Sequence, residues 1–300
     1  MHNIPVTHFF HIEGVPKELQ KVFLREYAAN GVKHIVLTDA MILNIMTDAN
    51  EKKFYRELLD STPVTYLDSH APFGLEFELS HPEKHLHKQK VYRLLLAMEI
   101  ASEFGIKTMT MHTGGIKYPS ISLQEHISEM LFTLEELLPA AKALDLTLCL
   151  ENVWHSTNTP EVLLELLSKF PGEKNLGLCF DAGHANLMGG KTILSYPESK
   201  TMQSWKMLGK LPPLDENILE KMLPYIVNCH LHDNDGSEDN HSIPGNGTVN
   251  WKKVMTTLSK APRLKCIQNE TSEPFQKNVT SGTSIRTMLE KFDSILQYLS

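Results

Sequence analysis

The chain has 300 residues, of which 41% are hydrophobic and 22% are charged, as in an ordinary globular protein. Its formal net charge of −7 argues against a general affinity for nucleic acid. No stretch approaches the roughly 18 uninterrupted apolar residues of a membrane span, and the first six residues lack a basic segment followed by an apolar run. We therefore expect a cytoplasmic protein without membrane association.

Eight short apolar, β-rich runs predict strands. They are Val6–His11, His34–Thr38, Val64–Asp68, Thr108–His112, Leu146–Glu151, Leu176–Asp181, Val227–His232 and Lys265–Glu270. Patterns of helical period lie between them, at Lys17–Asn30, His87–Phe104, Leu123–Leu144, Pro160–Lys169 and Asn250–Lys260, with a closing helix over about Ser281–Leu299. This α/β alternation predicts one (β/α)8 TIM barrel domain over residues 1–300. An open doubly wound sheet is the alternative, but no glycine-rich phosphate loop follows the first strand.

The segment Leu187–Pro213 interrupts this alternation. It contains Gly189, Gly190 and Pro197, and it is too long for a simple loop. It follows the sixth predicted strand on the face where barrel active sites form. Two interpretations stay open for this insertion, a lid over the substrate or a surface elaboration.

Each of the four cysteines falls inside a short apolar run, at positions Cys149, Cys179, Cys229 and Cys266. None forms the close pairs of zinc ribbons or redox motifs. Cys149 and Cys179 stand two residues before an acid, which places them one layer deeper on the same strand face. Packed core thiols are the favoured interpretation, and soft metal ligands are the alternative.

Metal-ligating residue types stand at the ends of the third to eighth predicted strands or directly after them. In chain order they are His70, His112, Glu151, Asp181, His184, His230, Asp239, His241 and Glu270. The C-terminal ends of parallel barrel strands meet at one rim, so these side chains should converge. Burying several carboxylates together is costly unless a cation compensates their charge. The placement therefore predicts a divalent metal, with zinc or manganese favoured and cobalt or magnesium as alternatives.

The other histidines are interpreted from the segments that carry them. Four lie on helical or loop segments and are expected to be solvated, namely His81, His85, His87 and His126. Three others are candidates to line a substrate pocket, namely His8, His11 and His155. We assign Trp154 and His232 to substrate binding, and His232 lies close to the predicted ligand His230.

These residues carry a resemblance to the xylose isomerase-like barrel superfamily, which contains sugar-phosphate isomerases and epimerases and the endonuclease IV family of DNA repair enzymes. The likeness is strongest over Gly177–His184 and over His230–Gly247, which is followed by Trp251. It implies a central metal held by four residues, Glu151, Asp181, His230 and Glu270. It also implies an acid–base role for the two glutamates, one removing a proton next to a carbonyl and the other returning it while the metal polarises the substrate oxygens.

The endonuclease IV branch of the superfamily implies two more metals. One would use His70, His112 and a bridging Glu151, and the other would use His184, Asp239 and His241. The chain matches all nine positions, so we expect one to three ions and keep a multi-zinc phosphodiesterase acting on abasic DNA as an alternative.

Three departures weigh against DNA repair. Gly74 stands where the repair enzymes place a bulky residue that enters DNA. Ala182-Gly183 precedes His184 where those enzymes have Thr-Cys, and the residues after His230 lack their lysine. The sequence therefore favours a metal-dependent isomerase or epimerase of a sugar, sugar phosphate or related polyol. A lyase or dehydratase on the same barrel is a further alternative, and a homo-oligomer is considered by analogy alone.

Overall fold

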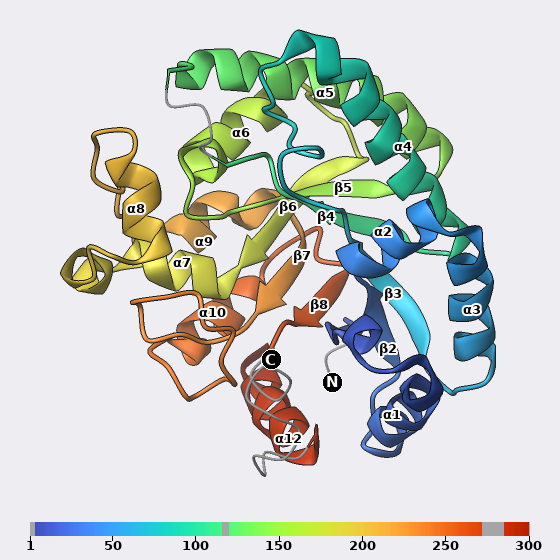
Figure 1. Cartoon of the computed structure of the whole chain (residues 1–300). Helices are drawn as coiled ribbons and strands as arrows, with labels where there is room; N and C mark the ends of the chain where they lie inside the picture. Colours follow the sequence, from blue (N-terminus) through green and yellow to red (C-terminus); the bar gives the residue numbers. More distant parts are fainter. Residues whose placement is uncertain (1–3, 116–119, 272–284, 300) are drawn as a thin grey trace.

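The computed structural model describes residues 4–115, 120–271 and 285–299. Eight parallel strands close into a barrel at the centre of the molecule, and helices surround it (Figure 1). Each strand pairs with its neighbours in sequence, and β8 pairs with β1 through Val6–Ile267 and Thr7–Gln268. The strands are β1 (Val6–His8), β2 (His34–Leu37), β3 (Thr65–His70), β4 (Thr108–Met111), β5 (Thr147–Glu151), β6 (Leu176–Asp181), β7 (Ile226–Leu231) and β8 (Cys266–Asn269). The predicted closed barrel is confirmed.

The helices are α1 (Lys17–Ala29), α2 (Asp39–Thr47), α3 (Ala49–Asp60), α4 (His87–Glu103), α5 (Leu123–Ala143), α6 (Pro160–Ser168), α7 (Ala182–Gly189), α8 (Lys200–Lys206), α9 (Ile218–Met222), α10 (Trp251–Leu258) and α12 (Ile285–Leu296). Short 3-10 turns are η1 (Ile12–Gly14), η2 (Lys84–Leu86), η3 (Ser156–Asn158), η4 (Lys191–Ser195), η5 (Leu223–Tyr225) and η6 (Gln297–Leu299). Among the helices described between β2 and β3, α2 and α3 had not been predicted. They form because Thr38 and Asp48 cap their N-termini, each accepting a backbone N–H two or three residues later.

Local sequence signals account for several helix starts. Ser122 and Glu125 form a reciprocal capping box at the start of α5. Pro160 occupies the first turn of α6, where its missing N–H costs nothing. Leu134, Leu137 and other apolar residues of α5 recur three or four positions apart and are buried in the main core between the helices and the barrel.

The strands bury side chains on both faces, as a parallel barrel requires. In β5, Leu148 and Leu150 join the main core, whereas Cys149 belongs to a separate cluster with Cys179 and Val227. All four cysteines are buried and unpaired, and burial raises the pKa of the Cys179 thiol well above its ordinary value. A protonated thiol packs as a small hydrophobe, as the favoured interpretation expects. The alternative of a soft metal ligand stays open at Cys179, whose sulfur lies within 4.8 Å of ligand atoms of Glu151 and His230.

The insertion after β6 forms η4 and α8 at the periphery of the barrel (Figure 1). Ile193 and Met202 from this segment pack on Leu187 of α7 in a small cluster of their own. Among the described helices, none has both the length and the apolar content needed to cross a bilayer.

Candidate metal centre and substrate pocket

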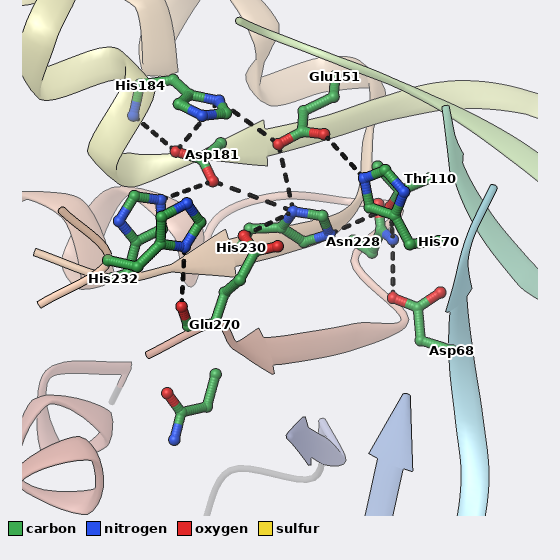
Figure 2. A network of polar contacts seen from close by, with 12 residues as sticks. Asp68, His70, Thr110, Glu151, Asp181, His184, Asn228, His230, His232 and Glu270 are labelled. Carbon is green, nitrogen blue, oxygen red and sulfur yellow. Dashed lines mark hydrogen bonds and ion pairs between the residues drawn. The ribbon is translucent and has the colours of Figure 1, made fainter. Parts of the chain in front are cut away.

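The ends of β5 to β8 bring four ligand-type side chains to one point on the barrel axis. His230 lies at their centre: its Nδ1 is 3.2 Å from Glu151 Oε1, 3.0 Å from Glu270 Oε2 and 4.0 Å from Asp181 Oδ2 (Figure 2). We call these four residues the central group. All four are buried, so their convergence is a property of the barrel interior and not of a flexible surface.

The central group fits a divalent metal. One ligand atom from each residue lies within 4.8 Å of all the others. Within the described residues, the buried atoms Glu151 Oε2, His230 Nδ1 and Glu270 Oε2 make no hydrogen bond of regular geometry and have only the close contacts among the site's own histidines and carboxylates. Three buried carboxylates around one imidazole carry a charge that a cation would compensate. This mixture of oxygen and nitrogen donors suits zinc or manganese.

The charges within the group are coupled. Burial alone would raise the pKa of Glu151, but His230 and His112 outweigh it and hold that pKa well below its usual value. Glu151 is therefore ionised at neutral pH, the state in which a carboxylate can bind a metal or accept a proton.

A first flanking group extends the site toward β3 and β4. Glu151 Oε2 lies 2.9 Å from His112 Nε2 and 3.5 Å from His70 Nε2. His70 places its Nδ1 2.8 Å from the carbonyl of Ala71, so Nδ1–H donates there and Nε2, which faces Glu151, would be the atom that binds an ion. These three residues could hold a second ion, with Glu151 shared between the two groups.

A second flanking group lies on the other side of the central group. Asp239 Oδ2 is 3.0 Å from His241 Nε2 and 3.5 Å from His184 Nε2. The Nδ1 atoms of the two histidines donate to backbone carbonyls, that of His184 to Asn152 O at 2.9 Å and that of His241 to Glu270 O at 3.0 Å. Asp239 outweighs the opposing effect of burial and raises the pKa of His241 to about 10. His241 adopts a left-handed φ of 46°, a strained conformation that is typical of functional sites.

His232 contacts both the central group and the second flanking group, and it does not line the cavity described below. Its Nε2 lies 3.1 Å from Asp181 Oδ2, its ring stacks on His241 at 3.9 Å between centroids, and it is fully buried. His232 is not among the described residues that line the cavity, and its ring nitrogen lies with those of His184 and His241 around Asp239, so its assignment to substrate binding stays a prediction. Its place depends on Gly183, because a Cβ added there would lie 2.0 Å from His232 Cε1.

Asp181 is oriented by more than His232. Its Oδ1 accepts the backbone N–H of His184 at 2.6 Å and so caps α7. Asn152 Oδ1 accepts the Asp181 N–H at 2.8 Å, and Asn152 Nδ2 donates to the Asp181 carbonyl at 3.0 Å. The helix cap and the amide thus hold Asp181 at the rim, as its place at a strand end predicted.

The loop that carries Asp239 and His241 is held by Asp233, which sequence reasoning had not singled out. Its Oδ2 accepts from Trp251 Nε1 at 2.9 Å and from Gly245 N at 2.8 Å, and its Oδ1 accepts from Val249 N at 3.1 Å. The signal for this role was the pairing of His-Leu-His-Asp with a downstream Gly-x-x-x-Trp pattern.

A cavity of about 600 Å³ opens above the three groups. Beyond the ligand residues, its lining includes Phe9, His11, Asp39, Phe73, Glu78, Trp154 and His155. Trp154 therefore lies where the predicted substrate contact requires, with its ring 5.0 Å from that of His184. His8 is instead buried beside Asn269, 3.1 Å from its amide nitrogen. Among the described lining residues there is no lysine or arginine, whereas Asp39, Glu78 and the ligand carboxylates are present.

The insertion does not cover this cavity. None of its described residues is part of the lining, but Trp205 Nε1 donates to the Trp154 carbonyl at 2.7 Å. The insertion therefore contacts the pocket residue Trp154 from the side away from the cavity. It is neither a lid over the cavity nor a surface elaboration without contact to the pocket. Phe73, whose side chain is about half exposed, stands at the mouth with its ring 4.9 Å from His112.

Three histidines that were expected to be solvated are buried, namely His81, His87 and His126. His126 Nδ1 lies 2.9 Å from the Ser80 carbonyl, and the His87 ring stacks on Phe132. His87 lies in α4, His126 in α5 and His81 in the loop before α4. The polar residue type alone did not reveal that these positions are buried. His85 is exposed as predicted.

Comparison with known proteins identifies the family. A family model described as xylose isomerase-like TIM barrel matches residues 24–275. The uncharacterized protein MJ1311 of Methanocaldococcus jannaschii is 27% identical over 252 residues, which cover 81% of this chain and 75% of that protein.

Two solved structures share the fold over nearly their whole length. A D-tagatose 3-epimerase-like protein has a TM-score of 0.69 at 22% identity and covers 99% of this chain and 97% of its own. The IolI protein with a bound zinc atom has a TM-score of 0.71 at 16% identity, and 99% of each chain is covered. At these identities the likeness establishes the barrel fold. Because the family match spans most of the chain, this protein belongs to the xylose isomerase-like TIM barrel family.

Proposed function

We propose that the protein is a divalent-metal-dependent isomerase or epimerase of an uncharged sugar or polyol. The observation that carries this proposal is the opposed placement of Glu151 and Glu270, which approach His230 Nδ1 to 3.2 Å and 3.0 Å and both line the cavity. Two carboxylates that flank one point can serve the two faces of a bound substrate. The sugar epimerases among the proteins of the same fold support this choice of reaction class.

The reaction would need one proton transfer in each direction. One glutamate carboxylate takes the proton from the carbon next to the carbonyl, and the electron pair of the broken C–H bond moves toward the carbonyl. For an epimer, the other glutamate returns a proton to the opposite face of the same carbon. For an isomer, the proton returns to the former carbonyl carbon, and the proton of the adjacent hydroxyl group moves to the former carbonyl oxygen. Polarisation of the substrate's oxygens is the chemistry that a divalent ion on the central group would supply.

The cavity narrows the substrate class. Its volume of about 600 Å³ is in the usual range for small-molecule sites. No described lining residue offers a cation to pair with a phosphate, and the lining adds the carboxylates of Asp39 and Glu78 to those of the ligand residues. Those carboxylates can accept hydrogen bonds from hydroxyl groups, and the rings of Phe73 and Trp154 can pack on the C–H faces of a sugar.

A second candidate is a multi-metal phosphodiesterase, and the two flanking groups are the observation that favours it. Each gathers histidines around one carboxylate, two around Glu151 and three around Asp239, as clustered hydrolytic metals require. The acidic lining of the described pocket weighs against a polyanionic substrate.

Solvent-exchange measurements would test the proposal. Protein loaded with manganese or zinc is incubated in D₂O with uncharged ketoses and aldoses, and the sugars are followed by NMR. We expect deuterium at the carbon next to the carbonyl together with a new epimer or isomer, and loss of both in Glu270→Gln. Glu135→Gln is a matched control, because Glu135 is exposed on α5 and is not part of the described cavity lining.

The same assay separates the alternatives. Dehydrated or cleaved products would indicate the lyase chemistry, and cleavage of an abasic oligonucleotide with no sugar turnover would favour the phosphodiesterase. Absence of exchange on every sugar tested, with metal bound, would contradict the proposed function.

A further inference from the structure

A carboxylate that the proposed reaction does not use is buried inside the barrel beneath the central group. Asp68 lies on β3 and is fully buried. Its side-chain partners come from β4, β7 and β8, so the carboxylate points into the barrel and not toward the surrounding helices. A buried carboxylate is costly compared with an apolar side chain of similar size, so its presence calls for a compensating role.

Asp68 is surrounded by groups that can donate. Its Oδ1 accepts from the Ser69 backbone N–H at 2.9 Å and from Thr108 Oγ1 at 2.7 Å. Its Oδ2 accepts from Asn228 Nδ2 at 2.9 Å and from Cys266 Sγ at 3.5 Å. This shell suits an acceptor and fixes the orientation of the carboxylate.

A chain of hydrogen bonds leads from Asp68 to the central group (Figure 2). Asn228 Nδ2 also donates to Thr110 Oγ1 at 2.9 Å, so the amide is held between Asp68 and Thr110. Thr110 Oγ1 in turn lies 3.1 Å from His230 Nε2. The other ring nitrogen, Nδ1, is the one that faces the carboxylates of the central group.

The direction of this chain follows from the metal-binding role of Nδ1. A ligating Nδ1 carries no proton, so Nε2 carries it and donates to Thr110. Asn228 Nδ2–H donates to the same hydroxyl oxygen, Thr110 Oγ1, so that this oxygen accepts two hydrogen bonds. The chain from Asp68 through Asn228 and Thr110 therefore reaches only the Nε2 edge of the His230 ring, on the side away from the ligand carboxylates.

We propose that Asp68 is a positioning residue of the metal centre, which acts through Asn228 and Thr110 to hold His230 with Nε2–H on Thr110 and Nδ1 toward the ion. The inference rests on the proposed function, because it assumes that the central group binds a metal. Residues that support a histidine ligand typically change metal affinity by 10- to 100-fold when they are removed.

Metal titration of the full chain tests this role without any substrate. Metal-free protein is titrated with up to one equivalent of Co²⁺ against a chromophoric chelator, and the visible absorption of the bound ion reports its ligands. We expect Asp68→Asn and Thr110→Val each to weaken binding about 10- to 100-fold and to alter the absorption. The double variant should be no weaker than the weaker single variant, since both changes break one chain of contacts.

Two controls separate positioning from packing. Thr110→Ser keeps the hydroxyl and should restore affinity to within about threefold of the unmodified protein. Thr7→Val makes the same exchange at another fully buried threonine of the barrel, whose Oγ1 has no hydrogen-bond partner among the described residues, and should leave affinity unchanged.

Unchanged affinity and absorption in Thr110→Val would overturn the proposal, and this variant decides the question if Asp68→Asn does not fold. A loss of metal-free stability with normal Co²⁺ binding would overturn it too. Failure of the unmodified protein to bind Co²⁺ would instead contradict the proposed function itself.

Discussion

The central group and the two flanking groups are built from the same residue types but are held in different ways. Asp181 and His230 stand within paired strands and are opposite one another in the β6–β7 register. Asp239 and His241 stand in a loop, and their side chains keep about a fifth of their surface exposed, whereas Asp181 and His230 keep none. Sheet hydrogen bonds therefore fix Asp181 and His230 of the central group, and loop contacts fix Asp239 and His241 of the second flanking group. We therefore expect the central ion to be the more tightly bound and an ion at the second flanking group to be the more exchangeable.

The largest effect should come from the residue that belongs to two groups. Glu151→Gln removes a ligand from the central group and from the first flanking group, and it removes one half of the acid–base pair. We expect turnover to fall by about 10³-fold or more, since general acid–base catalysis alone contributes roughly 10²- to 10⁴-fold. The bound metal, counted by mass spectrometry, should fall as well. An unaltered metal count would break the proposed sharing of Glu151.

The barrel and the convergence of ligand-type residues at one rim were predictable from periodicity, whereas the division into a central group and two flanking groups was implied by the resemblance to a family. Strand residues alternate between faces, so an acid or histidine at a strand end, such as Glu151 or His230, points to the rim. The place of His232 was not predictable in this way. It depends on the space above Gly183 and on a stack with His241, which the intervening loop brings close. Contacts between segments that are distant in sequence leave no periodic trace.

Helices α2 and α3 show the same limit on a larger scale. The residues of α2 are largely apolar, so their burial against neighbouring elements and not an amphipathic pattern defines the helix. The caps at Thr38 and Asp48 were the available signals.

A smaller effect should follow from changing a flanking group alone. His241→Ala removes one ligand from the second flanking group and leaves the central four residues intact. We expect the loss of any ion held there, with the central ion retained and turnover reduced by about 10- to 100-fold, the range found for supporting residues of metal sites. Metal counting together with steady-state kinetics measures both. Loss of the central ion in this variant would show that the groups are not independent.

The contact between Gly183 and His232 offers a test by stability. Gly183→Ala places a methyl group 2.0 Å from His232 Cε1, an overlap that the fully buried ring cannot relieve easily. Overpacking of this kind costs about 1–3 kcal/mol, which urea unfolding of the metal-free protein would detect. Adding His232→Ala should recover part of this loss. If the two changes were simply additive, the ring and the glycine would not be coupled.

The smallest effect is expected at the insertion. Trp205→Phe removes the hydrogen bond to the Trp154 carbonyl but keeps an aromatic ring in the same place. We expect a loss of about 1 kcal/mol in unfolding free energy and a severalfold increase in KM, with kcat nearly unchanged. Gln203→Ala, on the exposed side of α8, is the control. A reduced kcat with unchanged KM would show that the insertion acts on the chemical step.

Anomalous X-ray diffraction from crystals grown with zinc or manganese tests the central claim most directly. Data collected at the absorption edge of the metal locate each ion without any assumption about the substrate. The account predicts a strong peak between His230 Nδ1 and the carboxylates of Glu151, Asp181 and Glu270, with weaker peaks or none at the flanking groups. A metal-soaked crystal without a peak at the central group would contradict the account.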